Sequence, residues 1–306
     1  MQYWKRLVLF IGSLVLAAVP VLAAGEGKRF ATPEEATEAL VSALEAQDQK
    51  ALLVIFGKEA KPLIASSDPL SERERRQAFL EAYGEAHSFT EPDPSTRVLE
   101  LGSDKFPFAI PLVKDEGGWR FDTAAGEEEL LARRIGHNEL ATIQACLAYV
   151  DAQREYYARK PMGEPMRYAQ RIASNKGKRD GLYWTTADGE DPSPLGDLFA
   201  NASMTPVTGD KTSRPYFGYR YRILTRQGPN AAGGAFDYIA HGKMIGGFAL
   251  IAYPADYGLS GVMTFLVNHD GVVFEKDLGA KTAKEAAAID SFNPDDSWKR
   301  IPQGAE

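Results

Sequence analysis

The sequence predicts an α+β protein with two domains, and three observations indicate this class. A long helical segment covers residues 133–159, and short strand-like runs follow it. The last two runs flank His269-Asp270-Gly271, a strong hairpin turn that is typical of antiparallel strands. About 280 residues remain after removal of a leader, which is enough for two hydrophobic cores.

Residues 1–23 resemble a secretory signal peptide, because Lys5 and Arg6 precede an apolar run that closes on small residues. We expect cleavage after Ala23 or Ala24, and the alternative is an uncleaved membrane anchor. No cysteine follows the run, so a lipid-modified N-terminus is not expected. The predicted location is periplasmic or extracellular, with no membrane attachment after cleavage.

Loss of Lys5 and Arg6 with the leader changes the formal net charge from −7 to −9, because the leader holds no acidic residue. An acidic protein has little attraction for nucleic acid, so no nucleic-acid partner is expected. Cys146 is the single cysteine, so no intramolecular disulfide can form. Its apolar helical neighbours predict a buried, inert thiol.

The N-terminal domain is predicted over residues 30–124. A helix through residue 56 would begin at Thr32, with Glu35 completing a capping box. The other predicted elements are a helix at 71–86 and strands at 97–101, 106–113 and 119–122. This order and the closing GGWRFD resemble the cone of nuclear-transport-factor-2-like domains.

The C-terminal domain is predicted over residues 125–301. Its helix carries an apolar stripe that we expect beneath the sheet, made of Leu140, Ile143, Leu147 and Val150. A long loop at 174–215 follows. Alternation after it predicts a half-buried strand with Phe217 and Tyr219 inside. Residues 248–253 are apolar on both faces, which predicts a central strand covered on both sides.

Many motifs in one order resemble the bacterial family catalogued as domain of unknown function 2950. They are RRIGHNEL, YVDAQREYY, DGLYW, SPLGDL, FGYRYRILTRQG, GGAFDY, GFALIAYPADYGLSGVMTFLVN and EKDLG. The resemblance spans about Phe30 to Trp298. The family has no established activity, so the resemblance implies no mechanism.

Residues ~133 to 279 also resemble pilin-like and pseudopilin-like globular domains. The shared pattern is an AQxxY helix at 152–156, a GY-x-Y strand at 218–221, an A-x-P strand end at 252–254 and F-x-V-N-x-x-G at 265–271. True pilins have a short basic leader and an apolar helix continuous with the AQxxY helix. This chain has a secretory leader and a domain inserted before the helix, so we expect a pilin-shaped domain without filament assembly.

Catalytic motifs are missing from the sequence. The four histidines form no HExxH or other close metal pair, and no G-x-S-x-G, phosphate-binding loop or dinucleotide glycine motif occurs. These observations favour a non-enzymatic protein and exclude no enzyme class by themselves.

Two acidic segments offer the one cofactor hypothesis, a weak calcium site. Carboxylate oxygens on loops are the ligands that Ca²⁺ selects, although the spacing is not that of an EF-hand. The candidate ligands are Asp188, Glu190, Asp191, Asp197, Asp295 and Asp296.

We therefore expect an exported protein that binds another envelope or secreted component, either a protein or a glycan. Tyr183 and Trp184 in the long loop are the candidate binding residues, because we expect them to be exposed. The alternative is a small-molecule binder or hydrolase with a pocket in the N-terminal cone. Its candidate residues are Tyr83, His87, Trp119 and Asp122.

Overall fold

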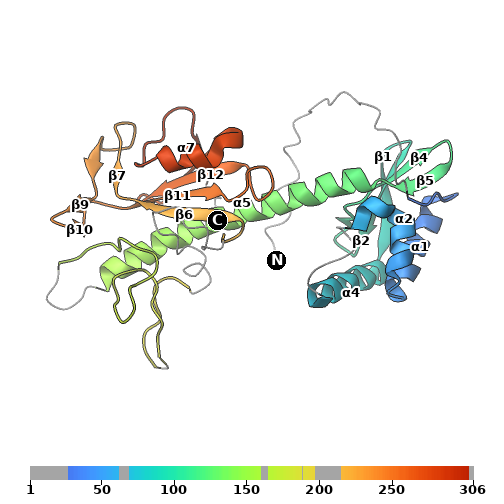
Figure 1. The fold of residues 1–306 in the computed structure, drawn as a ribbon, viewed down its shortest axis with the longest axis horizontal. Coiled ribbons are helices and arrows are strands. Elements are labelled where there is room, and N and C mark those ends of the chain that lie inside the picture. The colour runs from blue at the N-terminus through green and yellow to red at the C-terminus, as the bar shows by residue number, and fades with distance from the viewer. Residues whose placement is uncertain (1–26, 62–68, 160–164, 188, 197–214, 303–306) are drawn as a thin grey trace. The chain divides into compact units, whose positions relative to one another are not determined.

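The computed structural model describes residues 27–61, 69–159, 165–187, 189–196 and 215–302 (Figure 1). The chain divides into two compact units, Met1–Glu129 and Leu130–Glu306, called unit 1 and unit 2 below. Helices and antiparallel strands occur in both, which confirms the α+β class. The predicted leader lies outside the described residues. Within the described ranges, no helix combines the length and apolarity needed to cross a bilayer.

The helices of unit 1 are α1 (Pro33–Glu45), α2 (Gln49–Phe56), the short 3₁₀ helix η2 (Lys58–Ala60) and α4 (Pro69–Glu85). The predicted cap of α1 is confirmed. Thr32 Oγ1 accepts a hydrogen bond from the Glu35 N–H at 3.1 Å, and the Glu35 carboxylate accepts one from the Ala31 N–H at 3.1 Å. The Glu35 N–H, which the first turn of the helix leaves unpaired, and the Ala31 N–H just before the cap are thereby satisfied.

The prediction of one helix from Thr32 to residue 56 is wrong, because the chain breaks between α1 and α2. Gln47 has a φ of 54°, in the left-handed region. Asp48 then caps α2, and its Oδ1 accepts hydrogen bonds from the N–H groups of Lys50 and Ala51, each at 3.0 Å. An aspartate that bonds the next turn's N–H groups starts a new helix rather than continuing the old one.

The strands of unit 1 are β1 (His87–Asp93), β2 (Thr96–Leu101), β3 (Phe106–Pro107), β4 (Leu112–Asp115) and β5 (Gly118–Phe121). They form one antiparallel sheet in the order β1-β2-β4-β5, with β3 also paired to β2. The predicted strand at 106–113 is split, since Ala109 and Ile110 leave the ladder and enter the core. Strand β1 was not predicted, because all of its residues except Phe89 are exposed and no apolar alternation marks it.

The core of unit 1 joins α1 and α2 to the sheet through Leu40, Ile55, Leu112, Trp119 and Phe121. The segment before α1 closes one side of this sheet. The N–H and C=O groups of Phe30 and Trp119 exchange two hydrogen bonds of 2.8 Å, so residues 28–30 lie beside β5. This pairing places the GGWRFD segment at the edge of the sheet that the chain before α1 covers.

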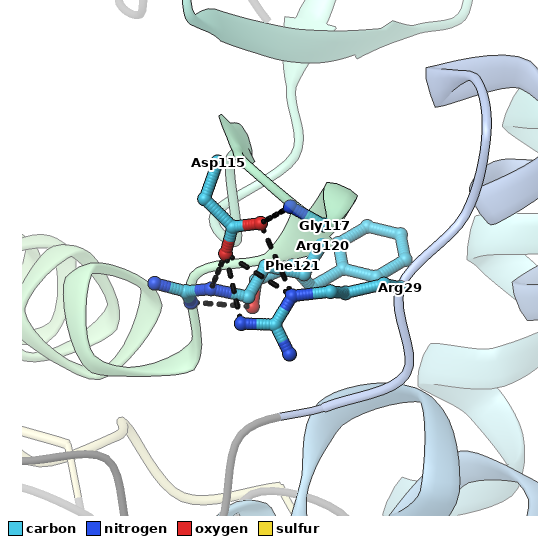
Figure 2. A network of polar contacts seen from close by, with 5 residues as sticks. All are labelled: Arg29, Asp115, Gly117, Arg120 and Phe121. Atoms are coloured by element: carbon cyan, nitrogen blue, oxygen red, sulfur yellow. Dashed lines mark hydrogen bonds and ion pairs between the residues drawn. The ribbon is translucent and has the colours of Figure 1, made fainter.

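A polar network holds the same segment from the other face of the sheet (Figure 2). The Asp115 carboxylate accepts three hydrogen bonds from the Arg29 guanidinium, at 2.9 to 3.2 Å, and one from the Gly117 N–H at 2.8 Å. Arg120 Nε lies 3.5 Å from Asp115 Oδ2. The Arg29 hydrogen bonds, followed by the Gly117 N–H, lower the pKa of Asp115.

Unit 2 contains most of α5 (Thr123–Ala158), which runs without a break, and α7 (Thr282–Ala288) with the short 3₁₀ helix η3 (Gly279–Lys281). Its main sheet is antiparallel, in the order β14-β13-β12-β11-β6. These strands are β6 (Tyr219–Leu224), β11 (Ala249–Pro254), β12 (Met263–Asn268), β13 (Val273–Asp277) and β14 (Lys299–Arg300). Four short strands form two further pairs: β7 (Arg226–Gln227) with β8 (Phe236–Asp237), and β9 (Ile239–Ala240) with β10 (Lys243–Met244).

Helices cover both faces of this main sheet, with α5 on one face and α7 on the other (Figure 1). On the α5 face, Tyr221 Oη donates to Thr142 Oγ1 at 3.3 Å. On the α7 face, Arg222 donates to the carbonyl oxygens of Ala286 and Ile289, at 2.8 and 2.6 Å. The prediction of a central strand covered on both sides is confirmed, since residues 249–252 of β11 are all fully buried.

The predicted stripe of α5 is confirmed in part: Val150 is buried and Ile143 and Leu147 are half-buried against the core, whereas Leu140 is 47% exposed. Thr142, Cys146, Tyr149 and Gln153, which were not part of the stripe, are fully buried. Their spacing of three and four residues is as helical as that of the predicted stripe. The polar ends find partners: Gln153 bonds the N–H and C=O of Ala169, each at 2.8 Å, and Tyr149 Oη donates to the Ala249 carbonyl at 3.3 Å. Satisfied polar groups can be buried at little cost, which periodicity alone does not reveal.

Candidate functional site

The predicted binding residue Trp184 is buried, so the expectation that it is exposed is wrong. It is 9% exposed, and the guanidinium carbons of Arg159 and Arg179 lie 5.8 and 5.4 Å from its ring centroid. Tyr183 is half-buried, and its N–H donates to the Ile172 carbonyl at 2.9 Å. Trp184 therefore belongs to the core of unit 2, and ligand binding by this pair stays a prediction.

The four residues of the alternative pocket lie in two separate places of unit 1. The rings of Tyr83 and His87 stack at 3.9 Å, where α4 meets β1. Trp119 belongs to the core, and the Asp122 carboxylate accepts a hydrogen bond from the Ala125 N–H at the start of α5. A shallow hollow lies elsewhere, on α4, and is lined by Arg73, Glu74, Gln77, Ala78 and Glu81.

The acidic residues proposed for calcium are placed only in part, because Asp188 and Asp197 lie outside the described residues. Glu190 is paired with Arg179 at 2.9 Å, and Asp191 is exposed. Asp295 accepts hydrogen bonds from the hydroxyl and the N–H of Ser297, which lower its pKa, and Asp296 is exposed. In the described parts of the chain, no three His, Cys, Asp or Glu side chains gather as a metal site. Calcium binding stays a prediction.

A different group of residues forms the best-defined exposed surface of unit 2. We call it the Phe217 surface, and it consists of His137, Leu140, Phe217 and Leu259. Leu140, Phe217 and Leu259 are 47%, 39% and 58% exposed. They come from three segments: α5, the turn before β6, and the loop between β11 and β12. Sequence reasoning missed this surface, because the alternating pattern placed Phe217 inside a strand.

Hydrogen bonds fix the β11–β12 loop to α5 below this surface. Asn138 Nδ2 donates to the Ser260 carbonyl at 2.8 Å. The Glu139 carboxylate accepts the N–H groups of Val262 and Met263, each at 2.9 Å. Charge-assisted hydrogen bonds to a carboxylate are about twice as strong as neutral ones. The loop that carries Leu259 is therefore held in one position on the helix.

Close packing leaves this loop little freedom. A Cβ on Gly261 would lie 2.1 Å from Tyr219 Oη, and that hydroxyl donates to the Met263 carbonyl at 2.9 Å. Burial, with a contribution from Glu139, raises the pKa of Tyr219, so its hydroxyl stays protonated and available as a donor. Glycine is required at 261 because any side chain would displace the tyrosine.

Phe217 is held in an unfavourable backbone conformation. Its φ is 49°, in the left-handed region, which costs a non-glycine residue about 1–2 kcal/mol. Gly218, with a φ of 72°, follows it, and a Cβ there would lie 2.8 Å from both Asn138 Nδ2 and Ser260 Cβ. Strand β6 begins only at Tyr219, so the prediction that Phe217 is buried is wrong. The prediction for Tyr219, which is fully buried, is confirmed.

The Phe217 ring is also fixed by its neighbours. It contacts the His137 ring edge-on, with centroids 5.8 Å apart, and the Tyr216 ring at 4.5 Å. Such aromatic pairs each contribute about 0.5–1.5 kcal/mol beyond burial. The surface thus presents an aromatic ring held by two ring contacts, and the helix and the loop that meet beside it each carry one exposed leucine.

The chemistry nearest to this surface is not that of a nucleophile. Cys146, the only thiol, is fully buried, and burial raises its pKa to about 12. A thiol of that pKa holds almost no thiolate at neutral pH. The prediction that Cys146 is buried is confirmed, and its inertness stays a prediction. What the exposed side chains offer is apolar and aromatic contact.

Comparison with known proteins supplies a family and no activity. No curated protein and no solved structure matches this chain. The family model described as "Protein of unknown function (DUF2950)" matches residues 27–301. The match covers both units, as the ordered motifs of the sequence predict. The chain therefore belongs to the DUF2950 family.

Proposed function

We propose that this protein is an exported, non-enzymatic binding protein, and that the Phe217 surface of unit 2 binds a protein of the cell envelope or a secreted protein. The observation that carries the proposal is Phe217 itself. An aromatic side chain is kept 39% exposed at a backbone position that disfavours every residue except glycine. Strain maintained by surrounding structure is a feature of ligand clamps and other functional sites.

The surrounding contacts support binding rather than folding as the role of this ring. Asn138, Glu139 and Tyr219 fix the loop and the turn before any partner arrives. A preorganised surface loses little conformational entropy on association. Rigid aromatic anchors flanked by apolar side chains are frequent among the residues that dominate binding energy at protein interfaces.

The finer fold assignments belong to the same proposal. We infer that unit 2 is a pilin-like domain, supported by one long helix packed on an antiparallel sheet, and that unit 1 is a cone of the nuclear-transport-factor-2-like kind. In unit 2, α7 covers the second face of the sheet, which leaves edges and loops rather than an open sheet face for a partner. The Phe217 surface lies where such loops meet α5. Export by the leader at residues 1–23 would place it in the periplasm or outside the cell.

Site-specific photo-crosslinking in cells of the native host tests the proposal. A photoreactive phenylalanine analogue replaces Phe217 in the full chain, and Phe236 serves as the matched control because it is also 39% exposed in unit 2. We expect position 217 to give one discrete adduct that mass spectrometry identifies as an envelope or secreted protein. Leu259→Asp in the same chain should abolish that adduct, because a carboxylate would be desolvated at the interface. Equal, diffuse labelling from both positions would contradict the proposal.

A further inference from the structure

The outer edge of β1 in unit 1 is unoccupied by any strand of the described chain. Strand β1 pairs only with β2 among the described residues, and six of its seven residues are exposed. An edge strand presents a row of N–H and C=O groups, and proteins normally pair, cover or blunt such a row. This edge belongs to unit 1 and is independent of the Phe217 surface.

The hydrogen-bonding pattern identifies which residues point outward. The Gly102 N–H donates to the Ala86 carbonyl at 2.8 Å, so Ala86 faces β2. The Phe108 N–H donates to the Leu99 carbonyl at 2.7 Å, so Leu99, the partner of Phe89, faces away from β1. Backbone groups in an antiparallel pair alternate in direction. The backbone groups of His87 and Phe89 therefore point away from β2, and Glu91 follows in the same phase at the start of the bulge.

This strand is complementary to itself. If a second copy pairs antiparallel with Phe89 opposite Phe89, His87, whose ring stacks on Tyr83 of its own chain, lies opposite Glu91 of the other copy, and Ser88 lies opposite Thr90. The facing pairs are then aromatic with aromatic, hydroxyl with hydroxyl, and imidazole with carboxylate. Each of these cross-strand pairs is favourable, by about 0.2–1 kcal/mol. Two-fold symmetry produces the imidazole–carboxylate pair twice.

The same register also satisfies the backbone. The two Phe89 residues would exchange two backbone hydrogen bonds, since their N–H and C=O groups both point outward. The backbone groups of His87 and Glu91 would form the next hydrogen-bonded pair in the same way. Phe89 is half-buried against the core of unit 1, so its partner would cover the remaining exposed part of the ring. Glu91 keeps its intrachain ion pair with Arg97, at 3.1 Å, and its side chain is 63% exposed, which leaves the second carboxylate oxygen accessible.

We propose that the protein forms a symmetric dimer in which the β1 strands of two copies pair antiparallel about Phe89. The occupant of the edge is thus a second copy of this chain. The dimer joins two sheets of unit 1 into one continuous sheet. Because a single strand edge is a small contact, the dimer is weak and depends on protein concentration.

The first test changes the charges of the facing residues His87 and Glu91. Dimerisation of the full mature chain is measured by sedimentation velocity over a range of concentrations. His87→Glu places a carboxylate opposite Glu91 of the other copy in each of the two symmetric pairs, so the dimer dissociation constant should rise about tenfold. The double variant His87→Glu/Glu91→Lys should restore dimerisation. Gln144→Glu is the control, since it adds the same charge at an exposed position of unit 2.

Disulfide trapping gives an independent readout. Cys146 is fully buried, so Phe89→Cys adds the only accessible thiol of the described chain. The two residues at 89 would have Cα atoms about 5.5 Å apart, within disulfide range. Mild oxidation should produce a covalent dimer from Phe89→Cys and not from Gln144→Cys. A wild-type chain that stays monomeric at every concentration, or equal crosslinking of both cysteine variants, would overturn the proposal.

Discussion

The two halves of the α5 segment in unit 2 differ in how they use their apolar and aromatic residues. Tyr149 and Gln153 are fully buried, Tyr149 donates to the Ala249 carbonyl, and Gln153 bonds the Ala169 backbone. Around His137 and Leu140, the helix exposes apolar atoms and braces a loop that exposes more of them. The first region stabilises the fold, because its side chains lose contact with water. The second region gains nothing from its exposed side chains unless another molecule covers them.

Truncation of the buried region should have the largest effect on stability. Tyr149→Ala removes a fully buried ring that packs edge-on against Phe248 at 5.6 Å. It also removes the hydroxyl that bonds Gln153 and Ala249. We expect a loss of about 3–5 kcal/mol in the free energy of unfolding, measured by urea denaturation. A loss below about 1 kcal/mol would show that this half of α5 is not docked on the sheet.

Asp115→Asn in unit 1 should lower the free energy of unfolding by a smaller amount than Tyr149→Ala, and this loss should disappear at acidic pH. The carboxylate is bonded by Arg29 and the Gly117 N–H, and its pKa is lowered in the folded state. Its contribution is therefore fully present above the ordinary aspartate pKa of about 3.9 and is lost as the pH falls through the lower folded value. Since the side chain is about one third exposed, solvent screening limits the difference to about 1 kcal/mol at pH 7.

Urea denaturation of wild type and Asp115→Asn between neutral and strongly acidic pH checks this prediction. The difference between the two proteins should shrink as the pH drops below about 4. Glu116→Gln, at the neighbouring exposed position, serves as the control and should show little difference at any pH. A difference that stays constant with pH would mean that the Asp115 charge is not what holds residues 28–30 beside β5.

Some features of the fold could be predicted from the sequence and others could not, and the difference has physical reasons. Local rules were sufficient for the Thr32 cap, the 269–271 hairpin turn and β11, since capping, turn chemistry and two-sided apolarity are encoded in neighbouring residues. They were only partly sufficient for α5: Val150 is buried as predicted, but the fully buried Thr142 and Gln153 were missed because their polar groups find partners that are distant in the sequence. They failed for Trp184, which looked exposed in a polar loop but packs against Arg159 and Arg179.

The Phe217 surface could not be predicted from local pattern. Its residues lie about 80 and 120 positions apart in the sequence, and a positive φ is visible only in the folded chain. The one available signal is the Phe217-Gly218 pair, since glycine before a strand often marks a turn with unusual backbone angles. The β1 edge was missed for a related reason: strands that bury little carry no apolar alternation.

The most direct test of the central claim compares one substitution at two equally exposed phenylalanines of unit 2. Phe217→Gly relieves the left-handed strain, which offsets the lost contacts with His137 and Tyr216, so the free energy of unfolding should change by less than about 1 kcal/mol. Phe236→Gly, in strand β8, should lose about 1 kcal/mol, because glycine weakens a strand and the contact with Tyr238 is removed.

Both variants are then assayed for the discrete partner that photo-crosslinking through Leu140 captures from the native envelope. We predict that Phe217→Gly remains as stable as wild type and no longer captures the partner, whereas Phe236→Gly is less stable and captures it normally. Binding by the Phe217 surface would be contradicted if Phe217→Gly captured the partner as wild type does, or if each variant lost capture only in proportion to its loss of stability.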